Sequence, residues 1–225
     1  MSSKVGGDVV SGLRSMESKH QSLTILRCKL VVVGDEGVGK TALSQMFESE
    51  GSRYPKNYMM TVGTEFLVKQ VRIPNTNVIV ELFIYDCAGQ AIFSLSDIQS
   101  KYYESACAFM VVYDVTNLKS FNQCSKWLSV VKSANSSLSS PLVGAIVANK
   151  IDHRSSVGDS RAVVDEEKGR RLAQSQEGGV AYFETSAANN VGVDEPFKYI
   201  ANEFYMKYES TVARGEDFVA SATGF

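Results

Sequence analysis

The sequence predicts an α/β domain built around a phosphate-binding loop (P-loop), with a mostly parallel six-stranded sheet, one antiparallel strand and helices on both faces. Two patterns lead to this fold class. Short apolar runs alternate with amphipathic segments between residues 26 and 208, and a glycine-rich loop joins the first run to the first amphipathic segment. With 225 residues the chain is long enough to bury the core of one such domain.

The expected strands are short runs rich in branched and aromatic side chains. Two of them, Leu67–Ile73 and Val78–Tyr85, are separated only by residues 74–77. This connection is too short for a crossover between parallel strands, so the two runs are expected to form an antiparallel hairpin. The expected strands are Leu26–Val33, Leu67–Ile73, Val78–Tyr85, Ala108–Tyr113, Leu142–Ala148 and Tyr182–Glu184.

Amphipathic segments fill most of the intervals between these strands and are expected to be helices. Trp127 shares helical spacing with nearby valines and is interpreted as a core residue. We expect a flexible N-terminal extension at 1–24, the domain at 25–209 and a flexible C-terminal tail at 210–225. The expected helices are Lys40–Glu48, Ser94–Tyr103, Leu118–Ala134, Asp165–Gln176 and Asp194–Tyr208.

Charge and cysteine content argue against several classes of function. The formal net charge is -2 and like charges do not cluster, so the composition gives no indication of nucleic acid as a partner. The four cysteines are irregularly spaced, which favours buried thiols in the cytoplasm over disulfides or a metal centre. The sequence ends in Ser-Ala-Thr-Gly-Phe, and because a prenyl anchor requires a cysteine there, we expect no direct lipid anchor.

Residues Gly34–Thr41 match the phosphate loop Gly-x-x-x-x-Gly-Lys-Thr in its required place, between an apolar strand and a helix. Backbone N–H groups of such a loop wrap the phosphates, and the helix N-terminus adds partial positive charge. We expect Lys40 to reach the β- and γ-phosphates and the Thr41 hydroxyl to bind Mg²⁺. The residues expected to contact a nucleotide here are Asp35, Glu36, Gly37, Val38, Gly39, Lys40, Thr41 and Ala42.

A second motif, Asp-x-x-Gly-Gln, follows the strand Val78–Tyr85. Asp86 is placed at the carboxyl edge of the sheet, beside the expected phosphate site, and is expected to hold Mg²⁺ through water. Gly89 offers an N–H group to a γ-phosphate oxygen, and Gln90 can orient an attacking water molecule. The motif is weak alone and gains its meaning from the phosphate loop.

A third motif, Asn-Lys-Ile-Asp, follows the fifth expected strand and indicates the base. The Asp152 carboxylate can accept hydrogen bonds from the ring N–H and exocyclic amine of guanine, a donor pair that adenine lacks. Asn149 is expected to brace the loops, and Lys150 to cover one face of the base. Ser186 and Ala187 follow the last strand, where the Ala187 N–H group can donate to the guanine carbonyl. The motifs thus predict GTP or GDP with Mg²⁺.

With these motifs in this order, residues 26 to 208 resemble the Ras superfamily of small GTPases, in its Rab-like branch. The resemblance implies the small GTPase G domain as the fold and hydrolysis of GTP to GDP and phosphate as the activity. Thr61 matches the first switch segment of the family, which implies a Mg²⁺ ligand beside Thr41 and Asp86. Tyr54 stands where such proteins place an aromatic side chain against guanine. The catalytic residues implied are Lys40, Thr61 and Gln90.

Four stretches resemble the Rab-like GTPase subunits of the intraflagellar transport complex B. This resemblance implies nucleotide-controlled assembly and cargo transport, location in cilia or flagella and at their base, and a stable heterodimer with a subunit like intraflagellar transport protein 25, besides other complex B subunits. Two alternatives stay open: a vesicle-trafficking Rab, and a scaffold that holds nucleotide without switching. The stretches are Glu81–Asp86, Val112–Asn117, Ser120–Leu128 and Tyr182–Ser186.

One departure from the family affects the expected rate. Glu36 occupies a phosphate-loop position where Ras-like proteins usually keep a tiny residue. Its carboxylate is expected to lie near the γ-phosphate, so we expect slow intrinsic hydrolysis. Gln90 is retained, so the positioning of water is expected to be intact.

Overall fold

A computed structural model of the protein describes residues 22–57, 59–89, 101–138, 141–154 and 164–215. Its strands are β1 (Thr24–Val33), β2 (Thr64–Arg72), β3 (Val78–Cys87), β4 (Ala108–Asp114), β5 (Val143–Asn149) and β6 (Ala181–Glu184). They form one six-stranded sheet in the order β2-β3-β1-β4-β5-β6. Neighbouring strands are parallel except β2 and β3, which form the expected antiparallel hairpin. The predicted fold class is therefore confirmed.

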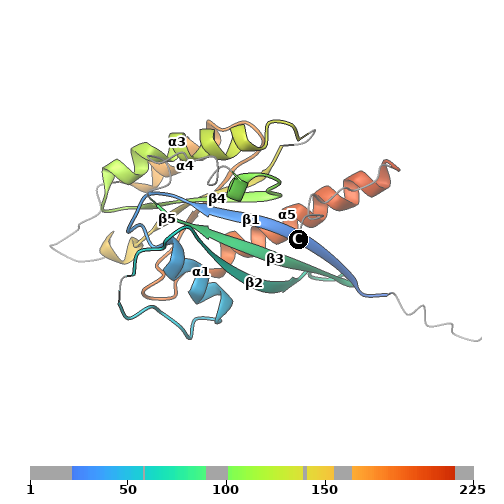
Figure 1. The fold of residues 1–225 in the computed structure, drawn as a ribbon, viewed down its shortest axis with the longest axis horizontal. Helices are drawn as coiled ribbons and strands as arrows, with labels where there is room; N and C mark the ends of the chain where they lie inside the picture. The colour runs from blue at the N-terminus through green and yellow to red at the C-terminus, as the bar shows by residue number, and fades with distance from the viewer. Residues whose placement is uncertain (1–21, 58, 90–100, 139–140, 155–163, 216–225) are drawn as a thin grey trace, which may run out of the picture.

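Helices cover both faces of the sheet (Figure 1). They are α1 (Lys40–Glu48), α3 (Leu118–Ala134), α4 (Glu166–Gln174), α5 (Asp194–Ala213) and the short 3-10 helix η1 (Ile151–Arg154). Buried residues of α1 and α5 pack on one face of the sheet, and those of α3 and α4 pack on the other. Within the described ranges, no helix combines the length and apolar character that crossing a bilayer requires.

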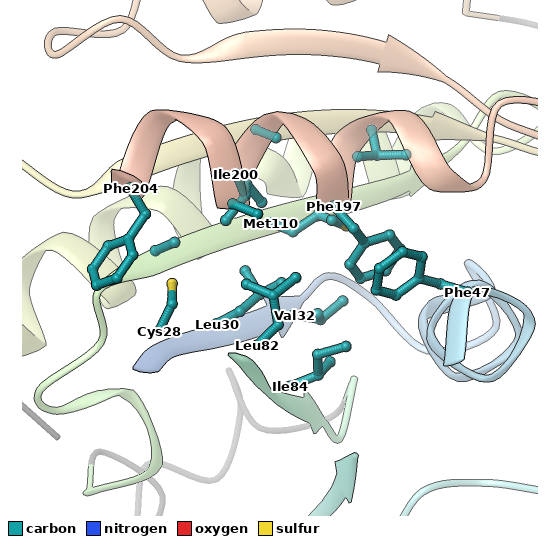
Figure 2. Packing of buried hydrophobic residues seen from close by; sticks show 14 of the residues in the cluster. Cys28, Leu30, Val32, Phe47, Leu82, Ile84, Met110, Phe197, Ile200 and Phe204 are labelled. Carbon is teal, nitrogen blue, oxygen red and sulfur yellow. The ribbon is translucent and has the colours of Figure 1, made fainter. Parts of the chain in front are cut away.

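The second half of the central strand β1 is buried on both sides, which explains its continuous apolar run, Leu30–Val33. Leu30 belongs to the cluster under α1 and α5, and the next residue, Val31, belongs to the cluster under α3. Figure 2 shows the first cluster, in which Phe47 of α1 stacks on Phe197 of α5 with ring centroids 4.0 Å apart. The strand that leads into the phosphate loop is thus packed between α1 and α5 on one face of the sheet and α3 on the other.

Several element boundaries differ from the sequence expectations by one or two residues, and two differ by three or more. Helix α5 continues to Ala213, beyond the expected end at Tyr208, because backbone hydrogen bonds continue after the apolar period stops and end only at Gly215, whose φ is 72°. Strand β2 begins at Thr64 because this residue already pairs with the end of β3. The expected helix Ser94–Tyr103 lies mostly outside the described residues, and residues 101–103 are helical.

Candidate nucleotide-binding site

The predicted motifs lie at one edge of the sheet. Strand β1 lies between β3 and β4, so the chain turns to one side of β1 and later crosses to the other. Such a reversal opens a crevice at the carboxyl end of the central strand, where ligands bind in open α/β sheets. The phosphate loop follows β1 directly and joins it to α1 (Figure 1), so it lies at this end of the central strand.

Glycines allow the phosphate loop to turn tightly against neighbouring strands. Gly34 has a φ of 143°, and a Cβ atom there would lie 2.1 Å from the carbonyl oxygen of Val112 in β4. Gly39 has a φ of 97° and caps α1 without a side-chain hydrogen bond. Because this cap supplies no side chain, a phosphate can accept hydrogen bonds from amides in the first turn of α1.

Lys40 is buried inside the loop, as its predicted role requires. Its Nζ atom donates hydrogen bonds to the carbonyl oxygens of Gly34 and Asp35, each at 2.9 Å. Burial lowers the pKa of Lys40, and the nearby Asp86 carboxylate partly offsets that shift. The ammonium group is therefore held where phosphate oxygens, which are stronger acceptors than carbonyl oxygens, can replace or join its present partners.

Three predicted metal ligands meet beside the start of α1. The Thr41 hydroxyl donates to Oδ2 of Asp86 at 2.5 Å and lies 2.9 Å from the hydroxyl oxygen of Thr61. Burial raises the pKa of Asp86 to about 6, although the Thr41 hydrogen bond and the charge of Lys40 lower it. Its other carboxylate oxygen, Oδ1, is buried with no hydrogen-bond partner among the described residues. A hard cation satisfies such an oxygen, so these residues fit Mg²⁺.

Gly89 lies directly against the phosphate loop. A Cβ atom at Gly89 would come within 2.3 Å of the backbone nitrogen of Glu36 and 2.5 Å of the carbonyl carbon of Asp35. Only glycine permits this approach, so the backbone of residue 89 borders the expected phosphate position. Gln90 lies outside the described residues, and its contact with the attacking water stays a prediction.

Asn149 joins three segments of the predicted site. Its side chain is buried, and Nδ2 donates to the carbonyl oxygen of Val38 at 2.9 Å. Its Oδ1 atom accepts hydrogen bonds from the Thr185 hydroxyl at 3.1 Å and from the backbone N–H of Ala187 at 3.2 Å. The predicted bracing role matches this geometry. The Ala187 N–H, which we expected to face guanine, here donates to Asn149, because β5 and β6 are neighbours and their ends come together.

The residues predicted to read the base lie in and beside the turn after β5. Asp152 accepts a hydrogen bond from the Ser186 hydroxyl at 2.6 Å, which fixes one carboxylate oxygen. Lys150 has a φ of 66°, and its Nζ atom lies 2.7 Å from Oδ2 of Asp114. Tyr54 is 48% exposed, between α1 and β2, and its contact with guanine stays a prediction.

Sequence analysis missed two residues that support this turn. Asp114 anchors Lys150, and its place at the carboxyl end of β4 was a usable signal, because the other motifs lie at the same edge. Arg154 pairs through Nη1 with Glu184 and donates from Nη2 to the carbonyl oxygen of Val164 at 2.9 Å, which holds η1 in place. Its partners lie far away in the sequence, so no local pattern reveals this role.

Comparison with known proteins gives consistent matches. Residues 29–207 match the Ras family. The chain is 40% identical over 187 residues to the intraflagellar transport protein 27 homolog of Homo sapiens, covering 83% of this chain and 95% of that protein. It is 39% identical over 198 residues to intraflagellar transport protein 27 of Chlamydomonas reinhardtii, with 85% and 91% covered. Ras-related protein Rab-10 of Caenorhabditis elegans is 34% identical over 192 residues, with 85% and 88% covered. These matches confirm the resemblance that short stretches indicated.

Proposed function

Because the chain belongs to the Ras family of small GTPases, we propose that it is a GTP-binding, Rab-like subunit of intraflagellar transport, whose nucleotide controls protein assembly and cargo transport in cilia or flagella. The observation that carries this proposal is that the residues predicted to bind the phosphates and those predicted to bind the base lie at one edge of the sheet and are joined by hydrogen bonds. Lys40 and Thr41 occupy the phosphate end, Asp152 occupies the base end, and Asn149 connects the two. The similarity to intraflagellar transport protein 27 in two distant organisms supports the ciliary role.

The base end favours guanine over adenine. A buried or partly buried carboxylate needs donors, and guanine offers two adjacent N–H groups while adenine would leave the charge unpaired. The Ser186 hydroxyl fixes one oxygen of Asp152, so the carboxylate has a defined orientation before the base arrives. The Lys150 stem is held by Asp114 and can cover the base.

The phosphate end suits a nucleotide with Mg²⁺. Thr41, Thr61 and Asp86 would hold the ion, which when bound neutralises charge on the phosphates. Thr61 lies on the segment between α1 and β2, so its contact with Thr41 links the state of that segment to the site. Loss of the γ-phosphate would weaken the contacts that hold this segment at the site. The segment would then change conformation, and a partner that binds it would respond to the nucleotide state.

Hydrolysis resets this device, and we infer that it is slow. Glu36 is exposed in the loop, beside the backbone of Gly89. A carboxylate there repels the γ-phosphate and occupies space that an activating arginine would need. Gln90 is retained and supplies a residue type that orients the attacking water.

Single-turnover hydrolysis of bound GTP tests this function. We expect slow loss of the γ-phosphate, abolished by Gln90→Leu and accelerated by Glu36→Gly. No turnover in any variant would favour a scaffold that holds nucleotide without switching. Purification of the tagged endogenous protein from ciliated cells tests the assembly role, with a small stable partner resembling intraflagellar transport protein 25 and other complex B subunits expected. Recovery of the chain alone would contradict it.

A further inference from the structure

Trp127 has a polar contact that its place in the core does not suggest. It is the single tryptophan of the chain and lies on α3 with no exposed surface. Its burial agrees with the sequence interpretation. Its indole Nε1 nevertheless donates a hydrogen bond at 2.9 Å to Oδ1 of Asp35, a residue of the phosphate loop. The only polar atom of this side chain is therefore directed at the nucleotide site.

Asp35 is an unfavourable residue for a phosphate loop unless its charge is kept aside. Its backbone carbonyl accepts a hydrogen bond from Lys40 at 2.9 Å, so it forms part of the cradle around the lysine. Its carboxylate is also close enough to raise the pKa of Lys40, partly offsetting the effect of burial. An ionised carboxylate that turned toward a triphosphate would repel it, strongly so in a partly desolvated loop.

Helix α3 holds this carboxylate. The indole hydrogen bond is charge-assisted, and such bonds are stronger than those between neutral groups. Cys124 lies one helical turn before Trp127 on α3. Burial raises the pKa of its thiol, and the charge of Asp35 raises it further. The hydrogen bond from Trp127 and the raised pKa of Cys124 thus both indicate that the Asp35 carboxylate lies beside α3.

We propose that Trp127 is a positioning residue for nucleotide binding: its indole N–H keeps the Asp35 carboxylate on α3 and so away from the phosphates. This inference rests on the proposed function, because it assigns a role within the same GTP site. It accounts for a buried tryptophan at this position and for the tolerance of an acidic side chain within the loop.

A double-mutant cycle tests the inference. GTP affinity in the presence of Mg²⁺ is measured with labelled nucleotide for the parent, Trp127→Phe, Asp35→Ala and the double variant. Phenylalanine keeps an aromatic ring in the core and removes the donor. We expect Trp127→Phe to weaken binding about tenfold, because a hydrogen bond to a charged group is lost and the carboxylate is released. In the Asp35→Ala background the same substitution should change affinity less than about twofold, since no carboxylate remains to restrain.

The control is Tyr103→Phe, which removes the hydroxyl of another buried aromatic residue in the same cluster. It should leave GTP affinity unchanged. Equal weakening by Trp127→Phe in both backgrounds would assign Trp127 a packing role only and overturn the inference, and so would no weakening in either. Failure of the parent to bind GTP would overturn the proposed function first.

Intrinsic fluorescence gives a second readout that does not depend on the stability of the tryptophan variant. Because the chain has one tryptophan, its emission reports the surroundings of Trp127, which include the Asp35 carboxylate. Asp35→Ala should shift the emission maximum of the nucleotide-free protein, whereas Asp194→Asn, an exposed substitution at the start of α5, should not. An unchanged spectrum in Asp35→Ala would contradict the contact on which the inference depends.

Discussion

Asn149 donates a hydrogen bond to the carbonyl oxygen of Val38 at 2.9 Å, across 111 positions of sequence. This bond ties the guanine motif to the phosphate loop. The Nδ2 atom also lies 2.4 Å from where a Cβ atom of residue 39 would be, so the contact requires glycine at that position. The two ends of the pocket therefore form one unit, and damage at their junction should affect both.

Asn149→Ala should destabilise the protein and weaken GTP binding together. It removes three hydrogen bonds and leaves the Val38 carbonyl and the Ala187 N–H buried without that partner. We expect the free energy of unfolding to fall by about 2 to 4 kcal/mol, measured in urea without nucleotide. Asn202→Ala, at an exposed position of α5, is the control and should change it by less than about 0.5 kcal/mol. A loss no larger than that of the control would contradict the bracing role.

Asp152→Asn should move base preference from guanine toward xanthine. The amide presents a donor where the carboxylate presented an acceptor, and xanthine has a carbonyl where guanine has its exocyclic amine. We expect GTP affinity to fall about 100-fold or more relative to xanthosine triphosphate, measured by competition. Asp165→Asn, which alters the exposed N-cap of α4, should keep the parental preference. The same preference in Asp152→Asn would remove Asp152 from the base pocket.

Ionised Asp86 should destabilise the free protein and yet be needed for Mg²⁺ binding. Burial raises its pKa from 3.8 to about 6, so the folded state binds the proton more tightly than the unfolded state. Its contribution to stability is therefore complete below about pH 4 and is lost as the pH rises through about 6. Without Mg²⁺ and nucleotide, Asp86→Asn should raise the free energy of unfolding at pH 7 by up to about 3 kcal/mol.

The same variant should lose function. Removing the carboxylate should lower the Mg²⁺-dependent affinity for GTP about 10- to 100-fold. Parental GTP binding should weaken as the pH falls through the region where Asp86 takes up a proton. A substitution that neither stabilises the free protein nor weakens Mg²⁺-dependent binding would contradict the assignment.

Arg154→Ala should weaken guanine nucleotide binding without altering the choice of base. Arg154 pairs with Glu184 and bonds to the Val164 carbonyl, and so holds η1, the element that carries Asp152. We expect nucleotide dissociation to accelerate about tenfold, measured by chase with unlabelled GTP, while the ratio of guanine to xanthine affinity stays fixed. Arg171→Ala breaks only an exposed pair with Glu167 and should leave the rate unchanged. An altered base ratio would instead indicate direct contact with the base.

Local sequence patterns predicted most of the fold because they follow directly from burial. The buried second half of β1 and the buried strand β4 have continuous apolar runs. Helix α3 follows Asn117, a favoured N-cap residue whose side chain accepts a hydrogen bond from the backbone N–H of Ser120. The two boundaries that differ most are those where hydrogen bonding and burial diverge. The end of α5 continues past its apolar stripe, and the start of β2 is set by pairing with β3.

The site was predictable to the extent that each motif follows a strand. Topology then brings Thr41, Thr61 and Asp86 together, and Asn149 to the phosphate loop. The contacts of Arg154 with Glu184 and of Trp127 with Asp35 join residues far apart in sequence. No periodicity or spacing encodes such pairs, because they depend on how the loops meet once the sheet has formed. The predicted roles of Gln90 and Tyr54 stay predictions.

The most direct test is the nucleotide content of the protein purified in Mg²⁺ buffer, measured by chromatography of the denatured sample. The account predicts close to one guanine nucleotide per chain, released by chelation of Mg²⁺ and absent from Lys40→Ala. Protein that carries no guanine nucleotide in the presence of Mg²⁺, or that carries adenine nucleotide instead, would contradict it.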